Sequence, residues 1–160
     1  MTGRIFSINI SSRKGEPKKM VQAGFLKEGH GLEGDVHAGS GNRQVSLLAI
    51  EEIEQFESGR NNTDVDISPG VFAENITTEG IDLSKVKAGD KFSVGKSVIL
   101  RVSQIGKECN AGCGISRKIG SCIMPKQGIF AVVEKGGEVK VRDKITLVRQ
   151  RSLLFPWLKI

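Results

Sequence analysis

The sequence predicts a mainly β protein, a barrel of short antiparallel strands with a few short helices. Two hairpin signals support this fold. Residues 90–94 and 97–102 have strand character and flank Gly95-Lys96, while residues 129–134 and 138–141 flank a second glycine-containing turn. Only one stretch shows clear helical periodicity, so short strands joined by tight turns dominate and favour a closed or nearly closed sheet.

The other elements follow from the spacing of apolar residues. Residues 50–56 place Ile50, Ile53 and Phe56 on one face and predict an amphipathic helix. Five glycines in residues 29–41 exclude regular structure there and predict a shaped loop. A helical turn is predicted at residues 81–86. Further strands are predicted at residues 4–11, 20–26, 43–49, 73–78 and 143–148.

The 160 residues fit one domain, with the barrel in residues 1–150 and an apolar tail in residues 151–160. We expect the tail to pack back on the barrel, with a dimer contact as the alternative. No stretch resembles a signal peptide or a membrane span, and three cysteines are an odd number, which favours a reducing compartment. A cytoplasmic protein with no membrane partner is therefore expected.

The formal net charge of +6 attracts phosphates, either on nucleic acid or on a small cofactor. The basic residues are scattered, however, and the chain has no Tyr and one Trp. Proteins that bind single strands usually interleave basic residues with aromatic stacking platforms, which are missing here. Nucleic acid is not expected to be the main partner.

All three cysteines, Cys109, Cys113 and Cys122, lie in residues 106–126, which are predicted to form one loop. Basic neighbours such as Lys107 favour the thiolate, which can attack sulfur, carry a persulfide or bind a soft metal. Three alternatives stay open. Cys122 could be a buried apolar residue, the outer cysteines could form a reversible disulfide, or the thiols could bind zinc together with a histidine. The spacing Cys-x3-Cys-x8-Cys is not common for structural zinc.

The glycine loop offers a second group of candidate residues, Gly34, Asp35, His37 and Arg43. Glycines let backbone N–H groups approach a phosphate closely, and an arginine can bind it through two hydrogen bonds. A lone histidine such as His37 is more often a structural hydrogen-bonding residue than a ligand. Asp35 could likewise only cap a turn.

Taken together, these motifs resemble the MOSC family, named for the C-terminal domain of molybdenum-cofactor sulfurases. The resemblance is carried by Gly31-Leu-Glu-Gly-Asp35-x-His37, Arg43-Gln-Val-Ser-Leu-Leu48, Pro69-Gly-x-Phe72-x-Glu74-Asn-Ile-Thr-Thr78, Gly89-Asp90, the Cys109 loop and Gly128-Ile-Phe130. It implies a β-barrel with a few short helices. It also implies handling of the molybdenum cofactor (molybdopterin), whose dithiolene binds molybdenum and whose side arm carries a phosphate.

The resemblance assigns roles as well. Cys109 matches the cysteine that ligates the metal and would be the catalytic or persulfide-carrying residue. Arg43, His37 and Asn75 fall on positions that line the family's cleft, and Gly34 and Lys107 join them as candidate cofactor-binding residues. Cys113 and Cys122 lie outside the general family pattern and are candidate relay thiols.

Two residues depart from the family pattern, because Ala73 and Arg142 stand where glycine is common. Both suggest slightly altered turns that leave the site unaffected. In the sulfurases a pyridoxal-phosphate cysteine desulfurase precedes this domain, and 160 residues leave no room for it, so a separate desulfurase or molybdoenzyme is the expected protein partner.

The leading hypothesis is a molybdenum-cofactor-binding or sulfur-carrier domain. The alternatives are a small molybdenum oxidoreductase acting on N-hydroxylated compounds and a zinc-stabilised module without catalytic activity.

Overall fold

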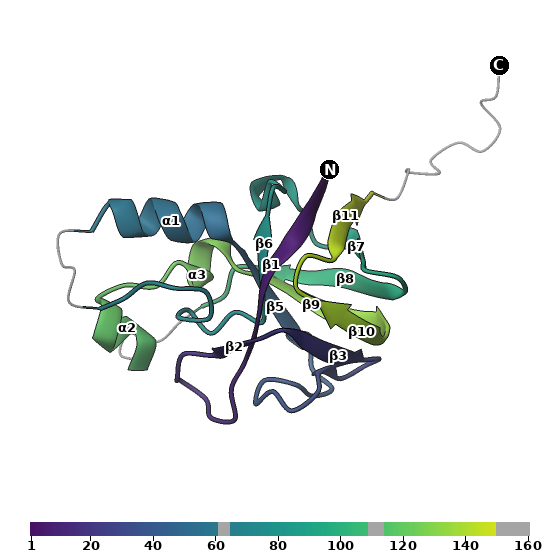
Figure 1. Ribbon diagram of the computed structural model, residues 1–160, viewed down its shortest axis with the longest axis horizontal. Helices are drawn as coiled ribbons and strands as arrows, with labels where there is room; N and C mark the ends of the chain where they lie inside the picture. The colour runs from purple at the N-terminus through teal and green to yellow at the C-terminus, as the bar shows by residue number, and fades with distance from the viewer. Residues whose placement is uncertain (61–64, 109–113, 150–160) are drawn as a thin grey trace, which may run out of the picture.

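The computed structural model describes residues 1–60, 65–108 and 114–149 of the chain (Figure 1). It is a β-barrel with a smaller sheet beside it and short helices at one end. The strands are β1 (Thr2–Ile10), β2 (Lys19–Val21), β3 (Ala23–Lys27), β4 (Gly31–Leu32), β5 (Val45–Ala49), β6 (Ile76–Glu79), β7 (Lys91–Val94), β8 (Val98–Ile105), β9 (Ile129–Lys135), β10 (Gly137–Lys140) and β11 (Lys144–Val148).

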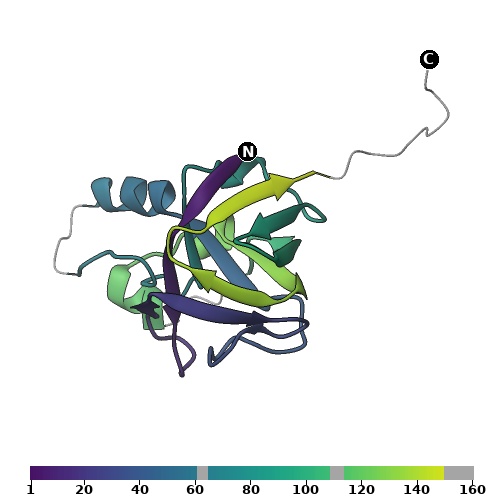
Figure 2. The same cartoon turned by 45° about the vertical axis from the view of Figure 1, so that its right-hand side comes forward.

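The barrel closes because β1 pairs with β11 as well as with β6. Around the barrel the order is β1, β11, β7, β8, β9, β5 and β6. In the closing pair, Thr2 lies opposite Thr146, and Figure 2 shows these two strands side by side. Among the described strands of the barrel, only β5 and β6 run parallel. The predicted β-barrel is confirmed, and its strands are antiparallel except for this one parallel pair.

The prediction of one strand at residues 20–26 was wrong. This stretch forms two strands in different sheets: β2 extends the barrel sheet along β1, whereas β3 pairs with β10 and β4. The chain leaves the barrel sheet at Gln22, whose carbonyl accepts a hydrogen bond from the Val141 amide. An apolar-polar pattern is continuous across such a change of sheet, so it could not mark the break.

The helix predicted at residues 50–56 is confirmed as α1 (Ile50–Ser58), which follows β5 without a loop. The helical turn predicted at residues 81–86 is a 3-10 turn, Leu83–Lys85. The exclusion of regular structure from residues 29–41 was wrong for the short strand β4, where Gly31 and Leu32 pair with β3, and the rest of that segment is a loop. The prediction of a single loop at residues 106–126 was wrong, because α2 (Gly114–Ile119) and α3 (Met124–Gln127) lie within it. Both helices are too short for a 3.6-residue period to show in the sequence. They pack through the buried side chains of Ile115 and Met124, and short helices depend on such packing for their stability.

Two apolar clusters hold the fold together. The first fills the barrel, and its largest fully buried side chains include Ile5, Phe92 and Leu100. The second packs α1, α2 and α3 against the outside of the barrel. It contains Leu48, Ile50, Ile53, Val71, Phe72, Ile115, Met124 and Phe130. In Figure 1 all three helices lie at the same end of the molecule. The apolar tail predicted at residues 151–160 lies outside the described residues.

Candidate functional site

A cavity of about 590 Å³ lies between the glycine loop and the second apolar cluster. Its wall is drawn from distant parts of the chain: the β1–β2 loop, the β4–β5 loop, the segment before β6, and the segment from β8 to β9. The lining residues are Lys14, Gly15, Val36, His37, Ala38, Gly41, Asn42, Arg43, Ser46, Phe72, Ala73, Asn75, Lys107, Ile115, Cys122, Met124 and Phe130.

Three basic side chains, Lys14, Arg43 and Lys107, line this cavity, and no Asp or Glu does so among the described residues. None of these three side chains forms an ion pair with a carboxylate of the residues that the structure describes. Arg43 and Lys107 lie over the ring of Phe130, with Cζ 5.8 Å and Nζ 6.0 Å from its centroid. The cavity therefore presents uncompensated positive charge beside an aromatic ring, which favours an anionic ligand.

A buried lysine stands behind His37. The Lys18 side chain is 0 % exposed, and its Nζ lies 2.7 Å from Asp35 Oδ1 and 2.9 Å from His37 Nδ1. Asp35 accepts two further hydrogen bonds, from the backbone amides of Ser11 and His37. This network ties the start of β2 to the glycine loop and holds the His37 ring at the cavity wall.

Burial, hydrogen bonds and neighbouring charges together shift the pKa values of Asp35 and His37. Burial alone would raise the pKa of the Asp35 carboxyl, but the hydrogen bonds from Lys18 and from the Ser11 amide lower it below its ordinary value. Burial lowers the pKa of His37, and the charge of Lys18 lowers it further against the opposing effect of Asp35. Asp35 is therefore ionised and His37 neutral near pH 7.

Asn75, predicted as a cofactor-binding residue, lies at the cavity wall and is 1 % exposed. Its Oδ1 accepts hydrogen bonds from the backbone amide and the hydroxyl of Ser46, at 3.0 and 3.2 Å. Its Nδ2 donates to the carbonyl of Asn9 at 3.4 Å. The Asn75 side chain thus joins β5 to β1 beneath the cavity and fixes the position of the wall.

Glu74 is buried beside Asn75, with one carboxylate oxygen satisfied and the other not. Oε1 accepts hydrogen bonds from the Gly70 amide and the Thr77 hydroxyl, whereas Oε2 has no hydrogen-bond partner in the described part of the chain. Burial raises the pKa of this carboxyl to about 7, against the opposing effect of these hydrogen bonds. Gly70 is required here, because its φ is +91° and a Cβ would lie 2.3 Å from the Lys18 carbonyl oxygen.

The structure brings most of the predicted site residues together. His37, Arg43, Asn75, Lys107 and Cys122 all line the cavity. Gly34 does not: it lies in an exposed turn beside Ile10, with φ +83°. Cys109 and Cys113 lie outside the described residues, although Cys109 follows the cavity residue Lys107 by two positions in the chain.

Sequence reasoning missed Lys14, Lys18 and Phe130 as parts of this site. Lys18 reads as one of two adjacent surface lysines, and only its contacts with Gly70 and Asp35 show that it is buried. Phe130 stands in the motif Gly128-Ile-Phe130, which by itself gives the ring no role in the site. No local pattern marks these residues, because each contact joins segments that are far apart in the sequence.

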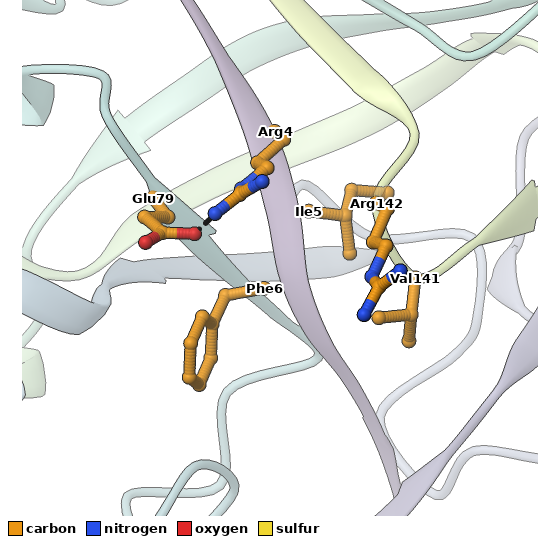
Figure 3. A pocket seen from close by; sticks show the side chains of 6 residues that line it. All are labelled: Arg4, Ile5, Phe6, Glu79, Val141 and Arg142. Atoms are coloured by element: carbon orange, nitrogen blue, oxygen red, sulfur yellow. Dashed lines mark hydrogen bonds and ion pairs between the residues drawn. The ribbon is translucent and has the colours of Figure 1, made fainter.

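A second, smaller hollow of about 340 Å³ lies on the outside of the barrel at Arg4, Ile5, Phe6, Glu79, Val141 and Arg142. Figure 3 shows Phe6 and the Arg4–Glu79 pair on one side of β1 and Arg142 on the other. Arg4 Nε lies 2.7 Å from Glu79 Oε2, so its charge is compensated. None of the sequence-predicted site residues lies here, which leaves the larger cavity as the candidate site.

Among the described residues, no group of three His, Cys, Asp or Glu side chains is placed to hold a metal ion. None of the described helices has the length and apolar character needed to cross a membrane.

Comparison with known proteins identifies the fold. The family model described as the MOSC domain matches residues 33–146. None of the curated proteins compared is significantly similar in sequence. The chain is similar in structure to the YuaD protein of Bacillus subtilis, with a TM-score of 0.73 and 21 % identity, covering 92 % of this chain and 96 % of that one. It is also similar to YiiM from Escherichia coli, with a TM-score of 0.70 and 22 % identity, covering 95 % of this chain and 72 % of that one.

Proposed function

This chain belongs to the MOSC domain family, and from that premise we propose that its cavity binds the molybdenum cofactor through the phosphate of the pterin. Cys109 is the proposed metal ligand or persulfide carrier. When bound, the cofactor would supply a molybdenum centre able to exchange electrons and sulfur.

The observation that carries this proposal is the unbalanced charge of the cavity. Lys14, Arg43 and Lys107 line it, and no acidic side chain among the described residues offsets them. An aromatic wall at Phe130 suits a flat heterocycle, and a cationic rim suits its phosphate. The residues present therefore fit an anionic, ring-bearing ligand of this kind.

The residues of the candidate site have different proposed roles. Arg43 and Lys107 bind the phosphate as charged hydrogen-bond donors. His37 contributes a neutral N–H group. Asn75 keeps the wall in place through Ser46 and Asn9. Cys109 provides the soft thiolate that molybdenum and sulfur both favour, and Cys122, on the cavity wall, is the proposed relay thiol.

The test is the metal and pterin content of gently purified protein, together with the affinity of the Arg43→Ala variant for the cofactor. Removing the guanidinium should weaken binding by about 1.5–3 kcal/mol, the range for a hydrogen bond to a charged group. The melting temperature should hardly change, because Arg43 is exposed. Arg101→Ala is the matched control, since Arg101 is exposed and lies outside the cavity lining.

Two results would contradict the proposal. One is zinc, rather than molybdenum and pterin, in the purified protein. The other is an Arg43→Ala variant that unfolds while each folded molecule still binds the cofactor normally. Reduction of N-hydroxylated compounds by the loaded protein would extend the proposal to an oxidoreductase, and transfer of sulfur from a separate cysteine desulfurase to Cys109 would extend it to a sulfur carrier.

A further inference from the structure

The Lys18 Nζ atom lies within hydrogen-bond distance of three polar atoms. Nζ lies 2.7 Å from Asp35 Oδ1, 2.9 Å from His37 Nδ1 and 3.3 Å from Ser11 Oγ. Both the Lys18 and the Asp35 side chains are 0 % exposed. A neutral lysine would leave the buried Asp35 carboxylate without its counter-charge, which is costly, so the pair is ionised.

An ammonium group has no lone pair and can only donate. His37 Nδ1 must therefore accept, and an imidazole nitrogen that accepts carries no proton. The single proton of the neutral ring is then on Nε2. We propose that Lys18 is a positioning residue that fixes His37 as the neutral Nε2–H tautomer and leaves this N–H group for a ligand in the cavity.

The surroundings of His37 resist a second proton. The charged groups that act on the ring are the cations Lys14, Lys18 and Lys107 and the anion Asp35, so positive charge predominates. Asp35 is already engaged by Lys18 and by two backbone amides, including that of His37 itself. His37 is thus fixed at two points, by the hydrogen bond from its backbone amide to Asp35 and by the contact of its Nδ1 with Lys18.

This arrangement gives the cavity a hydrogen-bond donor that stays neutral and keeps the same geometry through the neutral pH range. A ligand oxygen can accept from Nε2, whereas a ligand N–H finds no acceptor on this ring. Which ligand meets the donor rests on the proposed function, but the tautomer itself does not, since it is set by residues behind the cavity wall.

The chain suits a direct test because it has two histidines, His30 and His37. Long-range ¹H–¹⁵N correlation spectra of the ligand-free protein separate the two neutral tautomers and the imidazolium, and a His37→Gln variant assigns the signals. At pH 7 we expect His37 as the Nε2–H tautomer, titrating below the ordinary histidine value of about 6.5. A wild-type His37 protonated on Nδ1 at pH 7, alone or as imidazolium, would overturn the proposal.

A pair of neighbouring lysines provides the matched comparison. Lys18→Met removes the buried ammonium while keeping the aliphatic stem, and Lys19→Met removes an exposed charge one residue away. In Lys18→Met the Asp35 carboxylate loses the counter-charge that Lys18 provides at Oδ1. Its Oδ2, 3.8 Å from His37 Nδ1, should then attract a proton to that nitrogen. The Nδ1–H form should appear and the pKa of His37 should rise by about one unit or more.

Lys19→Met should leave both the tautomer and the titration of His37 unchanged. A folded Lys18→Met protein with the wild-type tautomer and pKa would contradict the positioning role. If Lys18→Met does not fold, the wild-type spectra decide the question, because they depend on no substitution. Neither measurement involves the cofactor, so failure here is distinct from failure of the proposed function.

Discussion

Arg142 adopts a left-handed backbone conformation, with φ +77°, in the turn between β10 and β11. Its amide donates to the carbonyl of Ile5 at 2.8 Å, and Asp143 Oδ2 accepts from the amide of Lys140. These bonds hold the turn in a conformation that disfavours a residue with a Cβ, by about 1–2 kcal/mol.

Arg142→Gly should therefore raise the free energy of unfolding, by about 0.5–1 kcal/mol once the greater flexibility of glycine in the unfolded chain is included. Chemical denaturation measures the change. Lys144→Gly is the control, because Lys144 lies in β11 without a positive φ and should lose about 0.5–1 kcal/mol. A loss of stability in Arg142→Gly as large as that in the control would show that the turn is not strained.

The sequence indicated this feature only indirectly. Ala73 and Arg142 are the positions where the family resemblance suggests glycine, and among the described residues they are the two non-glycine residues with positive φ. Ala73 also packs against the second apolar cluster and lines the cavity, so replacing it would change more than strain. Arg142 is the cleaner test for this reason.

Glu74 links stability to pH. Its pKa rises from 4.5 to about 7 on folding. Between pH 4.5 and pH 7 the folded state therefore keeps a proton on this carboxyl that the unfolded state has lost. The contribution of Glu74 to stability is complete below pH 4.5 and falls as pH rises to 7, by about 3 kcal/mol at most.

Glu74→Gln should remove this dependence. The variant and the wild type should differ little near pH 4.5, and the variant should be more stable at pH 8, by roughly 1–3 kcal/mol. Urea unfolding at both pH values measures the difference. Glu138→Gln, at an exposed position, is the control and should show no such divergence. Equal curves for wild type and Glu74→Gln at both pH values would mean that the carboxyl is not protonated by folding.

At the scale of elements, β1 is the strand on which the barrel depends, since it pairs with β2, β6 and β11. It passes close to the end of β6 at Gly3, where a Cβ would lie 2.3 Å from the Glu79 carbonyl oxygen and 3.0 Å from Ile81. The first strand and β6 can approach only because Gly3 has no side chain there.

Gly3→Ala should thus destabilise the barrel by about 1–3 kcal/mol, the usual cost of forcing extra atoms into a packed site. Gly39→Ala is the matched control, because a Cβ at Gly39 meets no atom within 4 Å and its φ is not positive. It should be neutral or slightly stabilising. Thermal unfolding of both variants gives the comparison, and equal melting temperatures would contradict close contact at Gly3.

The sequence predicted elements well where local patterns decide them. The alternation in β1, the glycine turns at Gly95 and Gly136, and the apolar face of α1 all depend on neighbouring residues. The break at Gln22, the parallel pairing of β5 with β6, and the helices α2 and α3 depend instead on contacts between distant segments. The same distinction applies to the residues of the candidate site. Arg43 and His37 stand in recognisable motifs, whereas Lys18 and Glu74 owe their roles to burial.

At the scale of the whole molecule, two apolar clusters supply the stability of the barrel and its helical end. We therefore predict that the protein folds without a bound metal. We expect a chelator to leave the melting temperature unchanged, and Cys109→Ser to fold normally while losing the cofactor or the persulfide.

Structural zinc would give the opposite result, because metal binding energy is then folding energy. Large and equal losses of stability in Cys109→Ser, Cys113→Ser and Cys122→Ser, reproduced by a chelator in the wild type, would support the zinc alternative. Metal and pterin content of the same preparations completes the measurement.

The pairing of Thr2 with Thr146 joins residues 144 positions apart, and this separation governs how the protein folds in time. Contacts so distant in sequence make folding slow, typically in milliseconds to seconds. During synthesis, at about 5–20 residues per second, the first strand leaves the ribosome roughly 7–30 s before the strand that closes the barrel against it. In that interval the edge of β1 that later meets β11 has no partner strand. We therefore expect a growing chain of this protein to be most prone to aggregation until β11 has emerged.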